Sequence, residues 1–306
     1  MSTQEDLFHP VVELPEPVRA ARYARLIGLE ETKTRLRKEA ALLADPDLLQ
    51  RWAKKYHHGE PAALTYFQDR APLFVFAGDV GAGKTALAES FGCDLAEHLD
   101  VPVYLYRLKL AIRGTGLVGE MTSLIGDAFA HLRSEGAKAR MSKGITSAFV
   151  LVVDEADALA QSRAAQQMHH EDRAGVDALL AGIDDLAGAR VPVIVVLCTN
   201  RQAALDPALM RRAAASFTFG RPSTDQRRAV LTEALAGVNF SDATLNKLVE
   251  LTGPHGTEPG FTYSDLTQRL VPTAVLQAFP DAPVADALLL QVAASLTPTP
   301  IFGDPS

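Results

Sequence analysis

Short apolar runs alternate with amphipathic segments through the middle of the chain. The apolar runs with the length of buried strands lie at 73–77, 103–108, 148–153, 193–198 and 216–219. Between them, apolar residues recur every three or four positions, which is the period of a helix with one buried face. One clear series is Met121, Leu124, Ile125, Ala128, Phe129 and Leu132. Strands that alternate with helices predict an α/β sandwich, in which helices cover both faces of a five-stranded parallel sheet.

The alternation ends before Ser223, and only helix signals follow it. Three residues have the chemistry of helix N-caps: Ser223, Ser241 and Thr262. Ser223 and Gln226 also have the spacing of a capping box. We therefore expect an αβα domain over 27–221 and a small all-helical domain with a loose C-terminal tail over 222–306. Residues 1–26 combine prolines with mixed charge, which favours an extended N-terminal arm.

Composition narrows the class of protein. The chain has 306 residues, of which 47% are hydrophobic, so it can bury a core and form two domains. Its net charge of −7 argues against nonspecific binding to nucleic-acid backbones. The N-terminus lacks a secretory signal, and no apolar run approaches the roughly 18 residues that a membrane helix needs. These features predict a cytoplasmic protein without a membrane or nucleic-acid partner.

The strongest chemical signal is a glycine-rich run between a strand-like segment and a helix-forming segment. Its residues are Gly78, Asp79, Val80, Gly81, Ala82, Gly83, Lys84 and Thr85. In such a loop, successive backbone N–H groups point at phosphate oxygens, and the next helix adds its positive end. We expect Lys84 to bind the β- and γ-phosphates of a nucleotide and Thr85 to ligate Mg²⁺. A simple glycine-rich turn is the alternative, and the full match of the motif argues against it.

Polar residues follow two later strand-like runs. Asp154 and Glu155 come directly after 148–153, and Asn200 comes just after 193–198. Ligands of an α/β sheet bind at the carboxyl ends of its strands. There, Asp154 suits a Mg²⁺ partner, and Glu155 suits the residue that polarises the attacking water. Asn200 could orient that water, although asparagine is also common in turns.

Two arginines, Arg211 and Arg212, follow a short predicted helix. Arginines at such a position are often solvated and interact with the helix dipole. An arginine offered to the γ-phosphate of a neighbouring subunit would instead stabilise charge in the transition state. Both interpretations stay open from the residues alone.

This order of motifs resembles the AAA+ ATPases. The resemblance implies a P-loop fold with a helical lid, a Walker A motif at 78–85, a Walker B motif at 149–155 and a sensor role for Asn200. It further implies that Arg211, with Arg212 beside it, is a finger reaching a neighbour's ATP.

The family resemblance assigns roles to three further places. Ile27 and Gly28 match an entry segment that contacts adenine. Leu117 and Val118 match a pore loop that grips substrate polypeptide, although the family's aromatic residue is missing. Ser264 stands where many relatives have the sensor-2 arginine, so this chain departs from the family pattern there.

Within that family, the segment 171–186 and the wide spacing of the two Walker motifs look most similar to the pachytene-checkpoint ATPases. These proteins remodel HORMA-domain proteins, and bacterial relatives without the N-terminal adaptor domain serve anti-phage signalling operons. The resemblance implies a homo-hexameric ring that uses ATP and Mg²⁺ to pull on a client polypeptide. It also implies that this client is a HORMA-domain protein. ADP would be the product.

Two other functions are compatible with the same motifs. An AAA+ ATPase that loads DNA or helps transposition needs a basic groove, and the basic clusters at 35–38 and 227–228 are small. A nucleotide-gated scaffold would bind ATP with little turnover. The presence of both Lys84 and Glu155 argues against the scaffold.

Overall fold

The computed structural model describes residues 4–57, 59, 61–68, 70–109, 120–158 and 170–301. The chain forms two compact units. The first comprises residues 1–25, 31–77 and 85–217, and the second comprises residues 26–30, 78–84 and 218–306. The second unit therefore includes two short segments from the first third of the chain, one of which is the glycine-rich loop.

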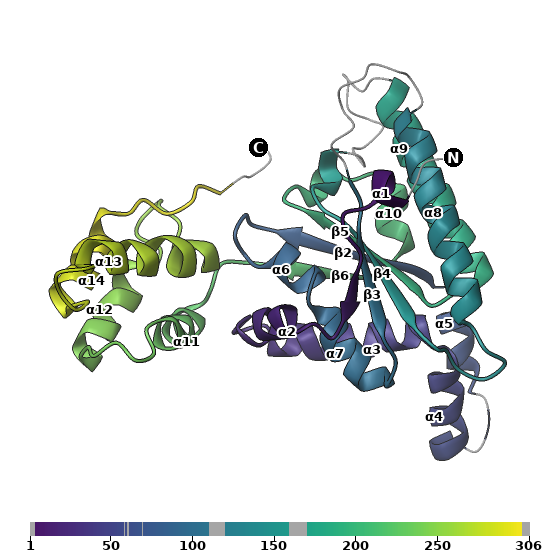
Figure 1. Cartoon of the computed structure of the whole chain (residues 1–306), viewed down its shortest axis with the longest axis horizontal. Helices are drawn as coiled ribbons and strands as arrows, with labels where there is room; N and C mark the ends of the chain where they lie inside the picture. The colour runs from purple at the N-terminus through teal and green to yellow at the C-terminus, as the bar shows by residue number, and fades with distance from the viewer. Residues whose placement is uncertain are drawn as a thin grey trace. The chain divides into compact units, whose positions relative to one another are not determined.

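A β-sheet forms the centre of the first unit (Figure 1). It has six strands in the order β1-β3-β4-β5-β2-β6. The strands are β1 (Val12–Leu14), β2 (Ala71–Gly78), β3 (Val103–Arg107), β4 (Ala148–Val153), β5 (Val193–Thr199) and β6 (Ala213–Phe219). Three neighbouring pairs, β3 with β4, β4 with β5 and β5 with β2, are parallel. Their carboxyl ends therefore meet at one edge of the sheet, as the strand pattern predicted.

Helices cover both faces of this sheet (Figure 1). In this unit they are α1 (Gln4–Leu7), α2 (Pro17–Ala24), α3 (Glu30–Ala44), α4 (Asp47–His57), α5 (Thr65–Gln68), α6 (Lys84–Ala88), α7 (Phe91–Leu99), α8 (Glu120–Ala139), α9 (His170–Ala189) and α10 (Pro207–Arg212). The predicted series on α8 is confirmed, because Ile125, Phe129 and Leu132 are buried in one core cluster with alternate strand residues. No helix in the described ranges is long and apolar enough to cross a membrane.

Residues 4–26 differ from the extended arm that the prolines of this segment predicted. Residues 12–14 form strand β1, which pairs antiparallel with β3 and adds a sixth strand to the five expected. Phe8 and Leu14 are buried, so this segment contributes to the core. Pro17 lies in the first turn of α2, where proline needs no hydrogen-bond partner, and Glu16 caps that helix. A strand of three residues is too short for its alternation to show in the sequence.

The second unit contains a small helical core. Its helices are α11 (Thr224–Ala234), α12 (Asp242–Leu251), α13 (Val271–Ala278) and α14 (Asp286–Ser295), with a π-helical segment at Asp265–Leu270. The capping box is present: the backbone N–H of Gln226 donates to Ser223 Oγ at 3.3 Å, and that of Ser223 donates to Gln226 Oε1 at 2.8 Å. Ser241 caps α12 as expected. The proposed domain limits at 27–221 and 222–306 stay predictions.

Candidate functional site

The loop between β2 and α6 has a backbone that requires glycine. Gly78, Gly81 and Gly83 have positive φ angles of 141°, 72° and 95°. A Cβ atom on Gly78 would lie 2.0 Å from the carbonyl oxygen of Phe219, and one on Gly81 would lie 2.9 Å from Thr262 Oγ1. Only glycine combines these angles with such close neighbours. The loop is therefore a tight turn held against the rest of its unit.

Lys84 folds back across this loop. Its side chain is buried, and its ammonium donates hydrogen bonds to the carbonyl oxygens of Gly78 and Asp79 at 2.9 and 2.7 Å. Arg221 forms an ion pair of 2.6 Å with the Asp79 carboxylate and also donates to the carbonyl of Gly260. Arg221 was not predicted as a site residue, because its place just before the capping box gives no sign of this role in the sequence. The Lys84 ammonium therefore places a positive charge at a fixed position on the loop, and the ion pair between Arg221 and Asp79 stabilises the loop.

The predicted adenine and lid residues belong to the same unit as the loop. Gly28 has a φ of 78°, and its carbonyl accepts a hydrogen bond from Gln226 Nε2 at 2.8 Å. Ile27 packs against the helical core. The backbone N–H of Ser264 donates to the Gly81 carbonyl at 3.1 Å. Ser264 therefore contacts the loop through its backbone, and no arginine is needed for that contact.

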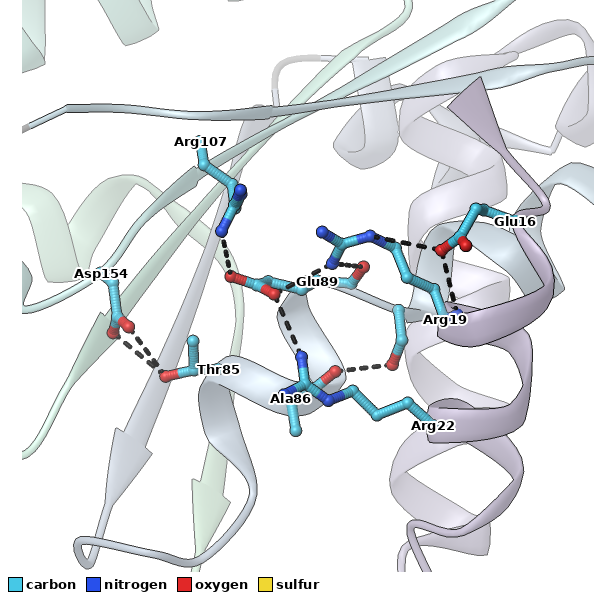
Figure 2. A network of polar contacts seen from close by, with 9 residues as sticks. Glu16, Arg19, Arg22, Thr85, Ala86, Glu89, Arg107 and Asp154 are labelled. Atoms are coloured by element: carbon cyan, nitrogen blue, oxygen red, sulfur yellow. Dashed lines mark hydrogen bonds and ion pairs between the residues drawn. The ribbon is translucent and has the colours of Figure 1, made fainter. Parts of the chain in front are cut away.

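At the start of α6, the Thr85 hydroxyl donates a hydrogen bond to the Asp154 carboxylate, at 3.0 Å to Oδ2 and 3.2 Å to Oδ1 (Figure 2). Asp154 follows β4 directly, so the structure brings together two residues that are 69 positions apart. The next residue, Glu155, has a φ of 49°. This left-handed backbone costs a non-glycine residue about 1 kcal/mol, and strained residues of this kind are concentrated at functional sites.

The oxygen atoms of Thr85 and Asp154 suit a magnesium ion. Mg²⁺ prefers hard oxygen ligands and is usually bound through one or two protein groups, with water and phosphate oxygens completing its shell. Across the residues described, no group of three or more His, Cys, Asp or Glu side chains is placed to hold a metal. Thr85 and Asp154 provide two such oxygen donors, which fits an ion whose remaining ligands are water and phosphate oxygens.

Asn200 lies at the same edge of the sheet as Asp154 and Glu155, because β4 and β5 are parallel neighbours. The residue before it, Thr199, is buried and donates a hydrogen bond to Asp157 Oδ1 at 3.0 Å. This bond ties the end of β5 to the turn that follows β4. This pair was not predicted from the sequence, although a threonine that ends a fully apolar strand was a possible signal.

The two arginines of α10 have different surroundings. The Arg212 guanidinium bonds both carboxylate oxygens of Asp184, at 2.8 and 2.9 Å, and these bonds raise its pKa. Arg211 is exposed, and within the described ranges its side chain makes no hydrogen bond or ion pair. Arg212 is thus committed to its own subunit, whereas Arg211 faces solvent. Leu117 and Val118, the predicted pore-loop pair, lie outside the described residues.

The site combines a glycine loop that enters a helix, an acid pair after one strand and an asparagine after the parallel neighbouring strand. This combination is typical of P-loop ATPases. Residues 74–221 match the family described as the ATPase family associated with various cellular activities (AAA). The chain is 47% identical, over 302 residues, to CD-NTase-associated protein 6 of Escherichia coli strain MS 115-1, a match that covers 98% of this chain and 97% of that protein.

Two solved structures share the fold over nearly their whole length. One is described as the E. coli MS115-1 HORMA:CdnC:Trip13 complex, and its similar chain has a TM-score of 0.93 at 46% identity, covering 98% of this chain and 99% of its own. The other, Rhizobiales Trip13, has a TM-score of 0.76 at 40% identity, covering 96% and 100%. The chain therefore belongs to the CD-NTase-associated protein 6 family of AAA ATPases.

Proposed function

We propose that this chain is a Mg²⁺-ATP-dependent remodeler of a HORMA-domain protein in a bacterial, cytoplasmic anti-phage signalling system. Membership of the AAA family implies ATP hydrolysis. The similar E. coli chain was solved in a complex described as containing a HORMA protein and CdnC, which supports a client of the HORMA class here. The observation that carries the ATPase proposal is the hydrogen bond from Thr85 to Asp154, because it joins the loop helix to the strand-end acid.

In this proposal, the loop residues 78–85 hold the phosphates of ATP. Their neighbours in the same compact unit support this role, since Ile27, Gly28 and Ser264 gather there with the loop up to Lys84. Lys84 would exchange its carbonyl partners for phosphate oxygens, which are stronger acceptors for an ammonium. Ile27 and Gly28 would lie beside adenine, as the family resemblance implies.

The acid pair and Asn200 would carry hydrolysis. Thr85 and Asp154 would hold Mg²⁺, which supplies charge neutralisation at the phosphate oxygens when it is bound. Glu155 would polarise the attacking water, and the strained backbone at this residue supports a fixed direction for its carboxylate. Asn200 would orient the same water from the neighbouring strand end. These roles divide positioning from proton transfer in the usual way for phosphoryl transfer.

We further propose a homo-hexameric ring in which Arg211 reaches the ATP of a neighbouring subunit. The exposed side chain of Arg211 and the ion pair that holds Arg212 support this assignment. An arginine supplied from a neighbour makes hydrolysis depend on assembly. Leu117 and Val118 would face the central pore and grip the client polypeptide, so that turnover pulls on it.

Two substitutions test the ATPase. Glu155→Gln should retain ATP binding and abolish phosphate release, whereas Lys84→Ala should lose binding itself. Glu97→Gln and Lys54→Ala change exposed residues on α7 and α4 and serve as matched controls with wild-type activity. Wild-type phosphate release from Glu155→Gln would reject the proposed catalytic role of that residue.

The client is tested separately. A HORMA-domain protein, the class present in the complex of the similar E. coli chain, is prepared in its closed state with a labelled peptide bound. Wild-type protein with ATP should release the peptide, and Glu155→Gln should not. Retention of the peptide by an active wild-type ATPase would reject the client and leave the ATPase assignment intact.

A further inference from the structure

The carboxylate of Glu89 lies at the centre of three arginines (Figure 2). Its Oε2 atom lies 2.9 Å from Arg19 Nη1 and 3.2 Å from Arg22 Nη1, and its Oε1 atom lies 3.4 Å from Arg107 Nη1. Arg19 and Arg22 belong to α2, Arg107 ends β3, and Glu89 follows α6. One acid therefore joins three elements that are distant in sequence. All four residues belong to the first unit.

This network is largely shielded from water. The Glu89 side chain is 12% exposed and that of Arg19 is 14% exposed, whereas Arg22 is 51% exposed. Shielded ion pairs depend strongly on both partners, because removing one leaves the other charge without compensation. Arg19 also donates to the main-chain carbonyl of Glu89 at 3.2 Å, which caps the end of α6. Glu89 and Arg19 are thus the centre of the network, and Arg22 lies at its edge.

Glu89 is one helical turn from the residue proposed to bind magnesium. Its backbone N–H donates to the Thr85 carbonyl at 2.9 Å, and the Thr85 hydroxyl in turn donates to Asp154. Helix α6 has only five residues, so it has little stability of its own. The arginines that hold Glu89 therefore fix the end of a short helix whose beginning carries Thr85.

From this geometry we propose that Glu89 is a positioning residue of the ATPase. It holds the Thr85 hydroxyl on Asp154 by anchoring α6 to β3 and to the N-terminal helix α2. Through this contact, the N-terminal helix α2 helps to position the nucleotide site. The inference rests on the proposed ATPase function and specifies how its magnesium-binding residue is held.

A second acid provides a matched control. Asp94 on α7 accepts a hydrogen bond from Tyr23 of α2 at 2.9 Å and forms an ion pair with Arg37 of α3 at 3.1 Å. Its side chain is 18% exposed, close to the value for Glu89. Asp94 therefore fastens the same N-terminal helix, but it lies beyond the helix that carries Thr85. Substitution of Asp94 therefore tests the effect of loosening α2 without a direct change at α6.

The test compares Glu89→Gln with Asp94→Asn in the full chain. Affinity for a fluorescent ADP analogue is measured with Mg²⁺ and with EDTA, and ATPase rates are measured alongside. We expect Glu89→Gln to keep its affinity in EDTA, to lose most of the gain that Mg²⁺ provides, and to lower kcat about tenfold with little change in KM. Asp94→Asn should keep both the magnesium gain and kcat. Glu89→Asp, which keeps the charge, should restore part of both.

An equal loss in Glu89→Gln and Asp94→Asn, or a wild-type magnesium gain in Glu89→Gln, would overturn the proposal. If Glu89→Gln does not fold, Arg107→Gln removes one partner from a less buried position and should show the same selective loss; an unaltered magnesium gain there also overturns it. Failure of the proposed ATPase function would look different, because wild-type protein itself would then show no nucleotide binding or turnover.

Discussion

Arg212 bonds both carboxylate oxygens of Asp184, from the end of α10 to α9 in the same subunit. The next residue toward the N-terminus, Arg211, is exposed, and among the described residues its side chain makes no hydrogen bond or ion pair. A two-point contact of this kind uses the planar guanidinium fully and leaves little capacity for another anion. The pair therefore separates two adjacent arginines into a structural one and an exposed one.

Substitution of each arginine should give a distinct result. Arg211→Ala should lower ATPase activity by at least about 100-fold with unchanged stability, because a finger arginine acts on the transition state. Arg212→Ala should lower the free energy of unfolding by up to about 1 kcal/mol, as expected for a partly exposed pair, and leave substantial activity. Steady-state ATPase rates and urea denaturation measure the two effects. The reverse pattern would make Arg212 the finger.

Mixing experiments locate that finger in the neighbouring subunit. Arg211→Ala and Lys84→Ala proteins should each be inactive, and mixed rings should regain part of the activity. In a mixed ring, some interfaces have an intact loop on one side and an intact finger on the other. No recovery in rings whose mixed assembly has been verified would contradict a finger that acts in trans.

The large elements could be predicted because each one leaves a periodic or motif signal. Apolar runs identified five of the six strands, and the capping box at Ser223 and Gln226 located the start of α11. The order of the site motifs was also visible, since polar residues follow buried strands at the edge where β4 and β5 end. Such signals are local, and a single sequence shows them directly.

The remainder depends on contacts between distant segments. Strand β1 has three residues, and its pairing with β3 has no local signature. Glu89, Arg19 and Arg107 resemble ordinary surface charges in the sequence, because only the fold brings their side chains together. Thr199 and Asp157 are 42 residues apart, and their hydrogen bond depends on the neighbouring positions of β4 and β5. No periodicity reveals pairs of this kind.

The Thr199 and Asp157 pair should hold the end of β5, and with it Asn200. Thr199→Val keeps the size of the side chain but removes the donor to Asp157 and the acceptor for Arg201 N–H. We expect a loss of about 1–2 kcal/mol in the free energy of unfolding and a several-fold fall in kcat. Thr146→Val, which removes a bond to a main-chain carbonyl elsewhere, is the control for stability alone. An unchanged kcat in a destabilised Thr199→Val protein would exclude the positioning role.

The pore-loop assignment predicts a separation of two activities. The double substitution Leu117→Ser and Val118→Ser should leave basal ATPase activity within a few-fold of wild type, because neither residue belongs to the proposed phosphate site. Client-stimulated turnover and opening of the HORMA protein should be lost, since the apolar grip is gone. Phosphate-release and client-opening assays, run with and without client, measure the two activities. Undiminished remodelling would reject the pore-loop role, and tight, salt-sensitive binding of duplex DNA by wild-type protein would favour the DNA-acting alternative.

The second unit should become unstable in acid through Asp265. Burial alone would raise the pKa of this carboxyl, but hydrogen bonds from Thr262 and Thr299 and the nearby Arg269 guanidinium outweigh burial and lower the pKa to about 2. A lowered pKa in the folded state means that the ionised form is stabilised by folding. Its contribution is therefore complete above about pH 4 and is lost as the pH falls from there toward 2. The shift from 3.8 corresponds to about 2 kcal/mol.

Asp265→Asn should remove this dependence. The variant should lose about 2 kcal/mol of unfolding free energy at pH 7, and its stability should change less than that of wild type between pH 4 and pH 2. Asp281→Asn changes an exposed aspartate of the same unit and should follow the wild-type curve. Urea denaturation across this pH range, followed by circular dichroism, gives the measurement. Thr262 and Ser264 both lie against Gly81, so the same acid range should also weaken nucleotide binding. Parallel curves of unfolding free energy against pH for wild type and Asp265→Asn would contradict the role of this carboxylate.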